Sequence, residues 1–291
     1  MKNIPAIDWK RVDLLIDMAI EEDLGETGDI TSLSVVPAEV QAKAVLRCKE
    51  EGMIMAGQAV AERVFRKLDP ACEYTVFKAD GEICKYGDIV AEVRGRAQSL
   101  LTAERTALNF IQRLCGVATT AGKYAAALGD SSTVVLDTRK TTPGYRNLEK
   151  YAVAVGGASN HRIGLFDRIM IKDNHREMAG MEGPGGIIRS VERARAMYPD
   201  LEVEVEVDTL EELDEALQSG CEYILLDNMS TEMMAEAVKR NQGRAKLEAS
   251  GNITIERLPE IAAVGVDYAS SGALTHSVKS SDISLDITPL K

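Results

Sequence analysis

EVEVEVDTLEELDEALQSGCEYILLD, residues 202–227, is the stretch that decides the fold. Two short runs rich in valine, isoleucine and leucine, 202–207 and 223–227, flank a segment whose apolar residues recur at helical spacing. A strand, a helix and a second strand in this order are typical of a βαβ unit with parallel strands. The stretch therefore predicts an α/β domain.

The same alternation extends in both directions from this unit. We predict six strands, at residues 134–138, 168–172, 202–207, 223–227, 246–250 and 267–271. Helices are expected between them, near residues 147–157, 184–197, 209–219, 230–241 and 254–264. The later strands begin about 21 residues apart, which is the spacing of a β/α barrel. A doubly wound open sheet is the alternative, because six strands do not prove that a barrel closes.

The first hundred residues follow a different pattern. Residues 8–24 predict one amphipathic helix, and residues 40–98 contain short apolar runs between turns, typical of a small α+β domain with antiparallel strands. The turns near residues 80–90 resemble a biotinyl-like hammerhead. Thr102 is expected to cap a helix that runs to about Leu114. We therefore expect an N-terminal domain over residues 1–112 and a barrel over 113–276, with the tail 277–291 packed on the first.

Composition limits the possible partners. The net charge is −12, which argues against a general nucleic-acid surface. Residues 138–176 nevertheless contain eight Lys or Arg and three acids, so this stretch carries +5 and the rest −17. A basic island in an acidic chain indicates a focused anion site, although a basic face balanced by its neighbours would look the same.

Location and redox state follow from simpler signals. The N-terminus has no secretory leader pattern and no apolar run reaches about 18 residues, so we expect a cytoplasmic protein without a membrane span. Five scattered cysteines indicate reduced thiols, and three histidines show no metal-ligand spacing.

Every predicted strand ends in polar residues, where the active sites of parallel α/β folds form. Arg139, Lys140 and Lys172 offer cations that hold carboxylates. Glu206 and Asp227 offer carboxylates for sugar hydroxyls or Mg²⁺. Backbone N–H groups at two later strand ends are suited to a phosphate, namely Ser250-Gly251-Asn252 and Ser271-Gly272-Ala273. The sequence contains no Walker, dinucleotide or nucleophile-elbow motif.

Several blocks of the chain resemble the quinolinate phosphoribosyltransferase family, also called carboxylating nicotinate-nucleotide pyrophosphorylase. The most specific are DTRKTTPGYRNLEKYAV (137–153) and GGASNHRIGLFDRIMIKDNH (156–175), and further similarity covers nearly the whole chain. The resemblance implies an N-terminal α+β open-sandwich domain followed by an incomplete β/α barrel. It also implies transfer of phosphoribosyl from phosphoribosyl pyrophosphate to quinolinate with Mg²⁺, giving nicotinate mononucleotide, pyrophosphate and CO₂ in the de novo synthesis of NAD.

The resemblance also implies roles for individual residues. Arg105, Arg139, Arg162 and Lys172 would grip the quinolinate carboxylates beside Thr138, with Arg105 supplied by the neighbouring subunit of a homodimer or a dimer-based hexamer. Lys140 and His161 would line the pocket on the pyrophosphate side, and Glu206 and Asp227 would hold the ribose hydroxyls and the metal. The 5′-phosphate would lie at Ser250, Gly251, Asn252, Ser271, Gly272 and Ala273. Lys140, His161, Lys172, Glu206 and Asp227 are thus the candidate catalytic residues.

Three other functions compete with this one. An aldolase-like barrel would use Lys172 or Lys140 in a Schiff base. A molybdenum-transport-associated homologue would share the fold and take another substrate. A regulator would bind phosphoribosyl pyrophosphate without releasing pyrophosphate. The set of cations at Arg105, Arg139, Arg162 and Lys172 favours quinolinate. Ser271 and a long 178–186 loop depart from the family pattern.

Overall fold

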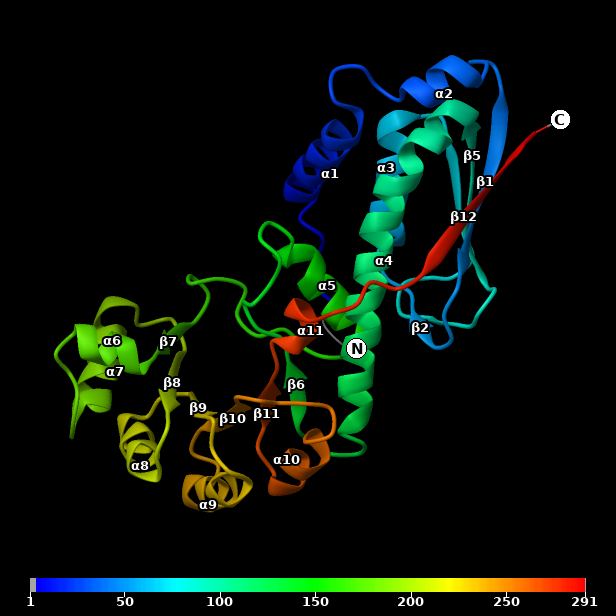
Figure 1. Cartoon of the computed structure of the whole chain (residues 1–291). Helices are drawn as coiled ribbons and strands as arrows, with labels where there is room; N and C mark the ends of the chain where they lie inside the picture. The colour runs from blue at the N-terminus through cyan, green and yellow to red at the C-terminus, as the bar shows by residue number, and fades with distance from the viewer. Residues whose placement is uncertain (1–3, 291) are drawn as a thin grey trace. The chain divides into compact units, whose positions relative to one another are not determined.

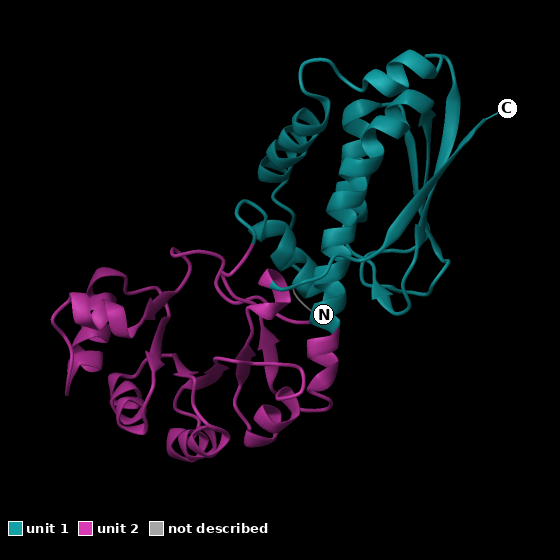
Figure 2. Cartoon of the chain, in the orientation of Figure 1, with its two compact units in different colours: residues 1–122, 142–157, 277–291 teal, residues 123–141, 158–276 magenta. Residues whose placement is uncertain are grey.

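The structure is a computed structural model that describes residues 4–290. The chain forms two compact units, coloured separately in Figure 2. Unit 1 contains residues 1–122, 142–157 and 277–291, and unit 2 contains residues 123–141 and 158–276. The division differs from the expected boundary at residue 112, because helix α4 (Ala97–Ala127) continues unbroken through it. The helix expected near 147–157 likewise belongs to unit 1 and not to the barrel.

Unit 1 is built on a four-stranded antiparallel sheet in the order β12–β1–β5–β3. Its strands are β1 (Gln41–Cys48), β3 (Glu73–Val76), β5 (Ile89–Arg96) and β12 (Ile283–Pro289). Alternate residues of β1 are buried, the pattern of a sheet that covers a core with one face. The C-terminal strand β12 pairs with β1, so the tail of the chain completes the sheet of this unit.

Helices cover this sheet in unit 1, where α3 and α4 run beside it (Figure 1). The helices are α1 (Trp9–Leu24), α2 (Ile30–Val35), α3 (Gln58–Leu68), α4 and α5 (Arg146–Gly156), and a short antiparallel pair joins β2 (Met53–Ile54) to β4 (Ile83–Cys84). The expectation that Thr102 caps α4 is wrong. The helix begins five residues earlier, directly after β5, and the Thr102 hydroxyl donates to the carbonyl of Gln98.

Unit 2 contains a six-stranded parallel sheet in the order β6–β11–β10–β9–β8–β7. The strands are β6 (Val134–Leu136), β7 (Ile169–Ile171), β8 (Val203–Val207), β9 (Tyr223–Asp227), β10 (Lys246–Ser250) and β11 (Tyr268–Ser270). The helices are α6 (Asp173–Met178), α7 (Gly186–Met197), α8 (Leu210–Ser219), α9 (Thr231–Asn241), α10 (Leu258–Val264) and α11 (Ala273–His276). All six strands lie where the sequence predicts them, within two residues at each end.

The strand order distinguishes a barrel from a doubly wound sheet. From β7 to β11 each strand lies beside the one that precedes it, and β6 then pairs with β11. A doubly wound sheet would reverse direction at a switch point. Right-handed crossovers in one direction place the helices on one face, so the sheet curves toward a barrel. Within the described residues β6 and β7 do not pair, and the barrel is incomplete.

Within residues 4–290, no helix has a stretch both long and apolar enough to cross a lipid bilayer.

Candidate active site

The interior of the incomplete barrel is lined by alternate residues of its strands. On β8, the side chains of Val203, Val205 and Val207 are buried, and Glu204 and Glu206 lie on the opposite side. The register places Glu206 beside Leu225 of β9, which in turn lies beside Glu248 of β10. Polar groups at these inward positions therefore face a shared interior.

A cavity of about 600 Å³ opens at the carboxyl ends of these strands. It is lined by Thr138, Arg139, Lys140, His161, Arg162, Met170, Lys172, Glu206, Leu225, Asp227, Asn228, Glu248, Ser250, Gly251, Asn252 and Ser270. Eleven of these sixteen residues are among those singled out from the sequence. The other five are Met170, Leu225, Asn228, Glu248 and Ser270. Glu248 was detectable, because it lies two residues before Ser250 on the same side of a strand.

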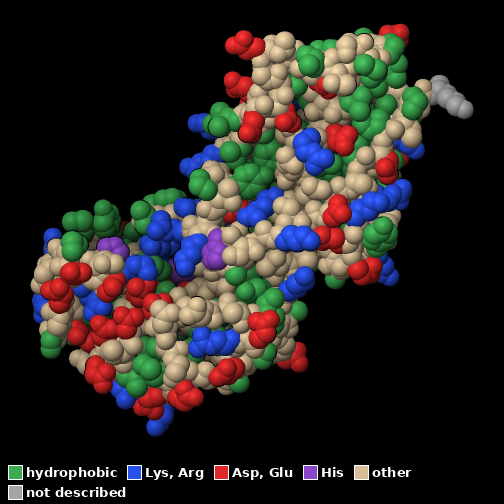
Figure 3. Space-filling view, viewed as in Figure 1, with side chains coloured by type: hydrophobic (Ala, Val, Ile, Leu, Met, Phe, Trp, Pro, Cys, Tyr) green, Lys and Arg blue, Asp and Glu red, His purple; other side chains and the backbone are tan. Residues whose placement is uncertain are grey.

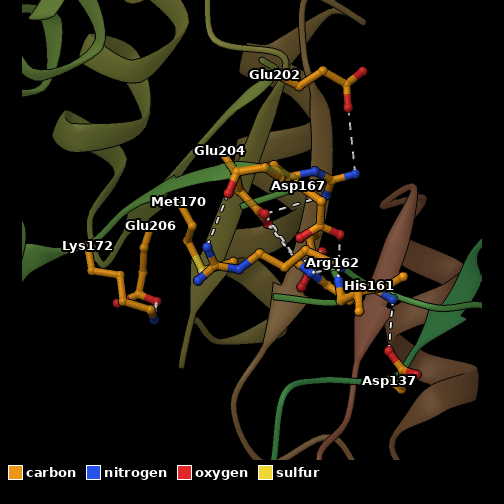
Figure 4. A network of polar contacts seen from close by, with 12 residues as sticks. Asp137, His161, Arg162, Asp167, Met170, Lys172, Glu202, Glu204 and Glu206 are labelled. Atoms are coloured by element: carbon orange, nitrogen blue, oxygen red, sulfur yellow. Dashed lines mark hydrogen bonds and ion pairs between the residues drawn. The ribbon is translucent and has the colours of Figure 1, made fainter. Parts of the chain in front are cut away.

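The cationic side of the cavity comes from β6 and from the loop before β7. The carboxylate of Asp137, which is fully buried after β6, joins the two segments: it accepts hydrogen bonds from the His161 backbone N–H at 2.8 Å and from Asn160 Nδ2 at 2.7 Å. These contacts, drawn in part in Figure 4, bring Arg162 beside Arg139. Burial and then the charge of Arg139 lower the pKa of Arg162. Two guanidinium groups held together in this way favour a bound anion.

The guanidinium of Arg162 contacts residues in and directly before β7. Nη1 donates to the carbonyl oxygen of Arg168 at 3.2 Å, and Nη2 lies 3.4 Å from Sδ of Met170. Figure 3 shows lysine and arginine side chains gathered with a histidine near the loop that precedes β7. Six of the eight lysine and arginine residues of the basic stretch 138–176 belong to unit 2, whereas Arg146 and Lys150 lie in α5 of unit 1.

Lys172 and Glu206 form an ion pair across the neighbouring ends of β7 and β8 (Figure 4). Burial raises the pKa of Glu206; Lys172 opposes this, and the charges of Asp227 and Asp173 add to it. An acidic pair at the ends of β8 and β9 with this repulsion is suited to a bound cation or to hydroxyl donors.

A deeper cluster joins His161 to two carboxylates. Nε2 of His161 lies 3.3 Å from an oxygen of Glu204 and 3.3 Å from an oxygen of Glu248. All three side chains are buried. Arg168 Nη1 lies 3.5 Å from Glu204 and its guanidinium stacks 3.9 Å from the ring centre of Tyr223.

The loops after β9 and β10 have an unusual backbone. Asn228, Gly251 and Asn252 all have positive φ angles, 53°, 88° and 49°. A Cβ atom on Gly251 would lie 2.1 Å from Oδ1 of Asn228, so only glycine fits. The Asn228 amide in turn donates to Asp227 Oδ2 at 2.8 Å. The two strand ends are therefore packed against each other through one glycine.

The remaining predicted residues lie elsewhere. The Ser271 hydroxyl donates to the carbonyl of Ile253 at 2.9 Å and its N–H donates to that of Leu136, so neither is available to a phosphate. Gly272 packs against Lys140, since a Cβ there would lie 2.9 Å from Lys140 Cδ. Ala273 begins the short helix α11. Within the described residues, none of these three lines the cavity. Arg105 is an exposed residue of α4 in unit 1.

Comparison with known proteins identifies the family. The model of the quinolinate phosphoribosyl transferase N-terminal domain matches residues 29–115, and that of the C-terminal domain matches residues 117–286. The chain belongs to the quinolinate phosphoribosyltransferase family. The resemblance found in the sequence is confirmed, as is the expected fold of an N-terminal α+β domain and an incomplete barrel.

Members of this family resemble the chain over nearly its full length. This chain is 44% identical to a probable nicotinate-nucleotide pyrophosphorylase [carboxylating] of Bacillus subtilis, over 92% of this chain and 90% of the relative. It is 42% identical to the chloroplastic nicotinate-nucleotide pyrophosphorylase [carboxylating] of Oryza sativa subsp. japonica, over 97% and 78%. The crystal structure of NadC from Streptococcus pyogenes superposes with a TM-score of 0.93 at 40% identity, covering 99% of this chain and 100% of that one.

Proposed function

We propose that this chain transfers the phosphoribosyl group of phosphoribosyl pyrophosphate to quinolinate and releases pyrophosphate and CO₂. The product would be nicotinate mononucleotide, a precursor of NAD. One observation carries the proposal: a single cavity is lined by Arg139, Lys140, Arg162 and Lys172 on one side and by Glu206 and Asp227 on the other. Four cations match a dicarboxylate and a pyrophosphate, and two acids match a sugar and its metal.

The proposed chemistry needs positioning more than a covalent nucleophile. The ring nitrogen of quinolinate attacks C1 of the ribose while the bond from C1 to pyrophosphate breaks, and positive charge develops on the sugar. Arginines that hold both carboxylates bidentately orient the nitrogen, and this orientation supplies much of the rate. The paired guanidiniums of Arg139 and Arg162 are the best candidates for that role, with Lys172 beside them.

Phosphoribosyl pyrophosphate is expected to lie on the other side of the cavity. Glu206 and Asp227 would accept hydrogen bonds from the ribose hydroxyls and hold Mg²⁺, a hard cation that prefers carboxylate oxygens. Burial, and then repulsion from Asp227 and Asp173, raise the pKa of Glu206, and a bound cation would favour its ionised form. The backbone around Ser250, Gly251 and Asn252 would receive the 5′-phosphate. Bound Mg²⁺ would supply neutralisation of the leaving pyrophosphate.

Other expectations join this proposal. Arg105 would reach the quinolinate site of the neighbouring subunit in a homodimer or a dimer-based hexamer, which its exposure on α4 permits. A cytoplasmic location is also proposed. The aldolase alternative requires an unprotonated lysine, whereas Lys172 is ion-paired with Glu206.

The test is pyrophosphate release with phosphoribosyl pyrophosphate and Mg²⁺, with quinolinate compared to nicotinate. We expect pyrophosphate release with quinolinate and not with nicotinate, accompanied by an equal amount of CO₂. Release with nicotinate but not quinolinate would refute the proposal, as would binding of phosphoribosyl pyrophosphate without turnover, which the regulator alternative predicts. Trapping of a carbonyl substrate by borohydride would favour the aldolase alternative.

A further inference from the structure

Glu248 is a buried carboxyl group in the cavity wall to which the proposed substrate contacts give no task. It lies in the middle of β10 and is 0% exposed, yet it lines the cavity. Within residues 4–290, neither of its oxygens has a hydrogen bond of normal geometry. Nε2 of His161 lies 3.3 Å from one of these oxygens, and the Ser270 side chain is a second polar neighbour. Buried carboxyl groups without well-aligned hydrogen bonds are rare in folded proteins, so this one indicates a specific role.

The charges around Glu248 indicate that the cluster retains a proton. If Glu204 and Glu248 were both ionised beside a neutral His161, the cluster would carry two negative charges. Arg168 balances one of them, and one would remain uncompensated. An uncompensated buried charge is costly, and one added proton removes it. Burial raises the pKa of Glu248; the contact with His161 opposes this rise, and the charge of Glu204 adds to it. Burial alone would lower the pKa of His161, but its contacts with the carboxylates of Glu204 and Glu248 raise it to about 9, so the three groups together retain a proton at neutral pH.

Hydrogen bonding at the ring places that proton on Glu248. The backbone N–H of Arg162 donates to Nδ1 of His161 at 2.6 Å, and a nitrogen that accepts a hydrogen bond carries no proton. Nε2 therefore carries the ring proton, directed at the two carboxylates. Arg168 favours the ionised form of Glu204 at 3.5 Å. Glu248 is the remaining site for the additional proton, and it faces the cavity.

The proposed reaction, on which this inference rests, consumes one proton. When the carboxylate next to the ring nitrogen leaves, the bond from C2 to the carboxylate carbon breaks and CO₂ departs. The electron pair stays on C2 beside the pyridinium nitrogen, and CO₂ can recombine with C2 until a C2–H bond forms, so protonation completes the loss of CO₂. We propose that Glu248, partnered by His161, donates the proton that replaces the departing carboxylate. Solvent returns a proton to Glu248 after the product leaves.

The other acids and bases of the cavity are occupied. Lys172 is ion-paired with Glu206. Lys140, Arg139 and Arg162 line the cavity as cations that would hold the substrate anions, and that role requires each to keep its proton. A route for the returning proton exists on the far side of the cluster. A second cavity of about 330 Å³ lies there, and His161 lines both cavities.

A divalent cation is a different use of the same three side chains. One ligand atom from each of His161, Glu204 and Glu248 lies within 4.8 Å of the others. Arg168 already contacts Glu204, and a metal there would face this guanidinium at close range. The charge balance therefore favours a proton.

The experiment is a single turnover of Glu248→Gln with phosphoribosyl pyrophosphate, Mg²⁺ and quinolinate, in which pyrophosphate and CO₂ are measured separately. Glutamine keeps the shape and cannot donate this proton. We expect pyrophosphate to form at close to the wild-type rate while CO₂ release slows by about 100-fold, the size of a lost general acid. The carboxylated nucleotide should accumulate, and quinolinate affinity should stay within about twofold.

The matched control is Glu204→Gln, which makes the same change at the other carboxylate of His161. Glu204 does not line the substrate cavity and cannot reach C2. The Glu204→Gln variant should therefore slow the formation of pyrophosphate and of CO₂ by the same factor. The inference is overturned if Glu248→Gln leaves the two products in step, whether both are slowed or neither is. If the wild-type protein releases no pyrophosphate with quinolinate, the proposed function itself fails, which is a separate result.

Discussion

Replacing Gly251 with alanine tests whether the loop between β10 and α10 builds the phosphoribosyl side of the cavity. Gly251 has a φ of 88°, a conformation that L-residues rarely adopt. Its added Cβ would lie 2.1 Å from Oδ1 and 3.0 Å from the backbone N of Asn228. The Asn228 side chain must therefore move, and its hydrogen bond to Asp227 is lost.

The magnitude follows from these two effects. An alanine at this positive φ costs about 1–2 kcal/mol for backbone strain alone, at Gly251 or at any other glycine with the same φ. Displacement of Asn228 adds about 1 kcal/mol for the lost hydrogen bond and more for the backbone contact. Gly265 provides the matched control, because its φ is 90° and nothing lies within 4 Å of its Cβ position. We expect Gly251→Ala to destabilise the protein by about 2–4 kcal/mol and Gly265→Ala by about 1–2 kcal/mol.

The assay is urea unfolding of both variants, together with calorimetric binding of phosphoribosyl pyrophosphate in the presence of Mg²⁺. Gly251→Ala should weaken that binding by about tenfold or more, equal to about 1.4 kcal/mol, because Asp227 loses the Asn228 amide that orients it. Gly265→Ala should bind normally. Equal losses of stability in the two variants, with unchanged binding in both, would refute the reasoning.

Three further predictions concern the cavity and its charge. Arg139→Ala should weaken quinolinate binding by about 100-fold with an intact circular dichroism spectrum, since it removes a charged bidentate partner; unchanged affinity would contradict the carboxylate role. Glu206→Ala should weaken binding of Mg²⁺ with phosphoribosyl pyrophosphate more than binding of quinolinate, measured by calorimetry, and equal losses would count against the division of roles. Burial and then the nearby charge of Glu204 raise the pKa of Glu248 above its ordinary value of 4.5, although His161 opposes this, so the stability from its proton is fully present below about pH 4.5 and is lost as pH rises through the raised pKa. The unfolding free energy, measured by urea unfolding, should therefore fall as pH rises over that range, and Glu248→Gln, which cannot titrate, should flatten the profile.

Much of the cavity could be predicted because its residues follow strands. In a parallel sheet all carboxyl ends lie at one edge, so Arg139, Lys172, Asp227 and Ser250 had to meet once their strands were recognised. The residues that were missed lie within strands or in the loop after Asp227. For Glu248 the alternation of side chains was a usable signal, whereas Asn228 depends on a positive φ that no pattern in the sequence announces.

Ser271 illustrates how tertiary contacts occupy groups that a local motif leaves open. A Ser-Gly-Ala turn at a strand end predicts a phosphate loop, and its chemistry permits one. In the folded chain its N–H and hydroxyl are taken by the carbonyls of Leu136 and Ile253. Local sequence says what a group can do, and its tertiary neighbours determine whether the group is available.

By itself the sequence determined the strands and helices of the βα units, the order of chemistry along the chain and the family, because these depend on local periodicity and on contiguous motifs. Only the tertiary structure decided that β6 pairs with β11 and β1 with β12, and that three separate segments form unit 1. It also brought His161, Glu204 and Glu248 to within 3.3 Å contacts. The physical reason is that these pairings join residues far apart in the chain, and burial of the whole sheet and its charges selects them together.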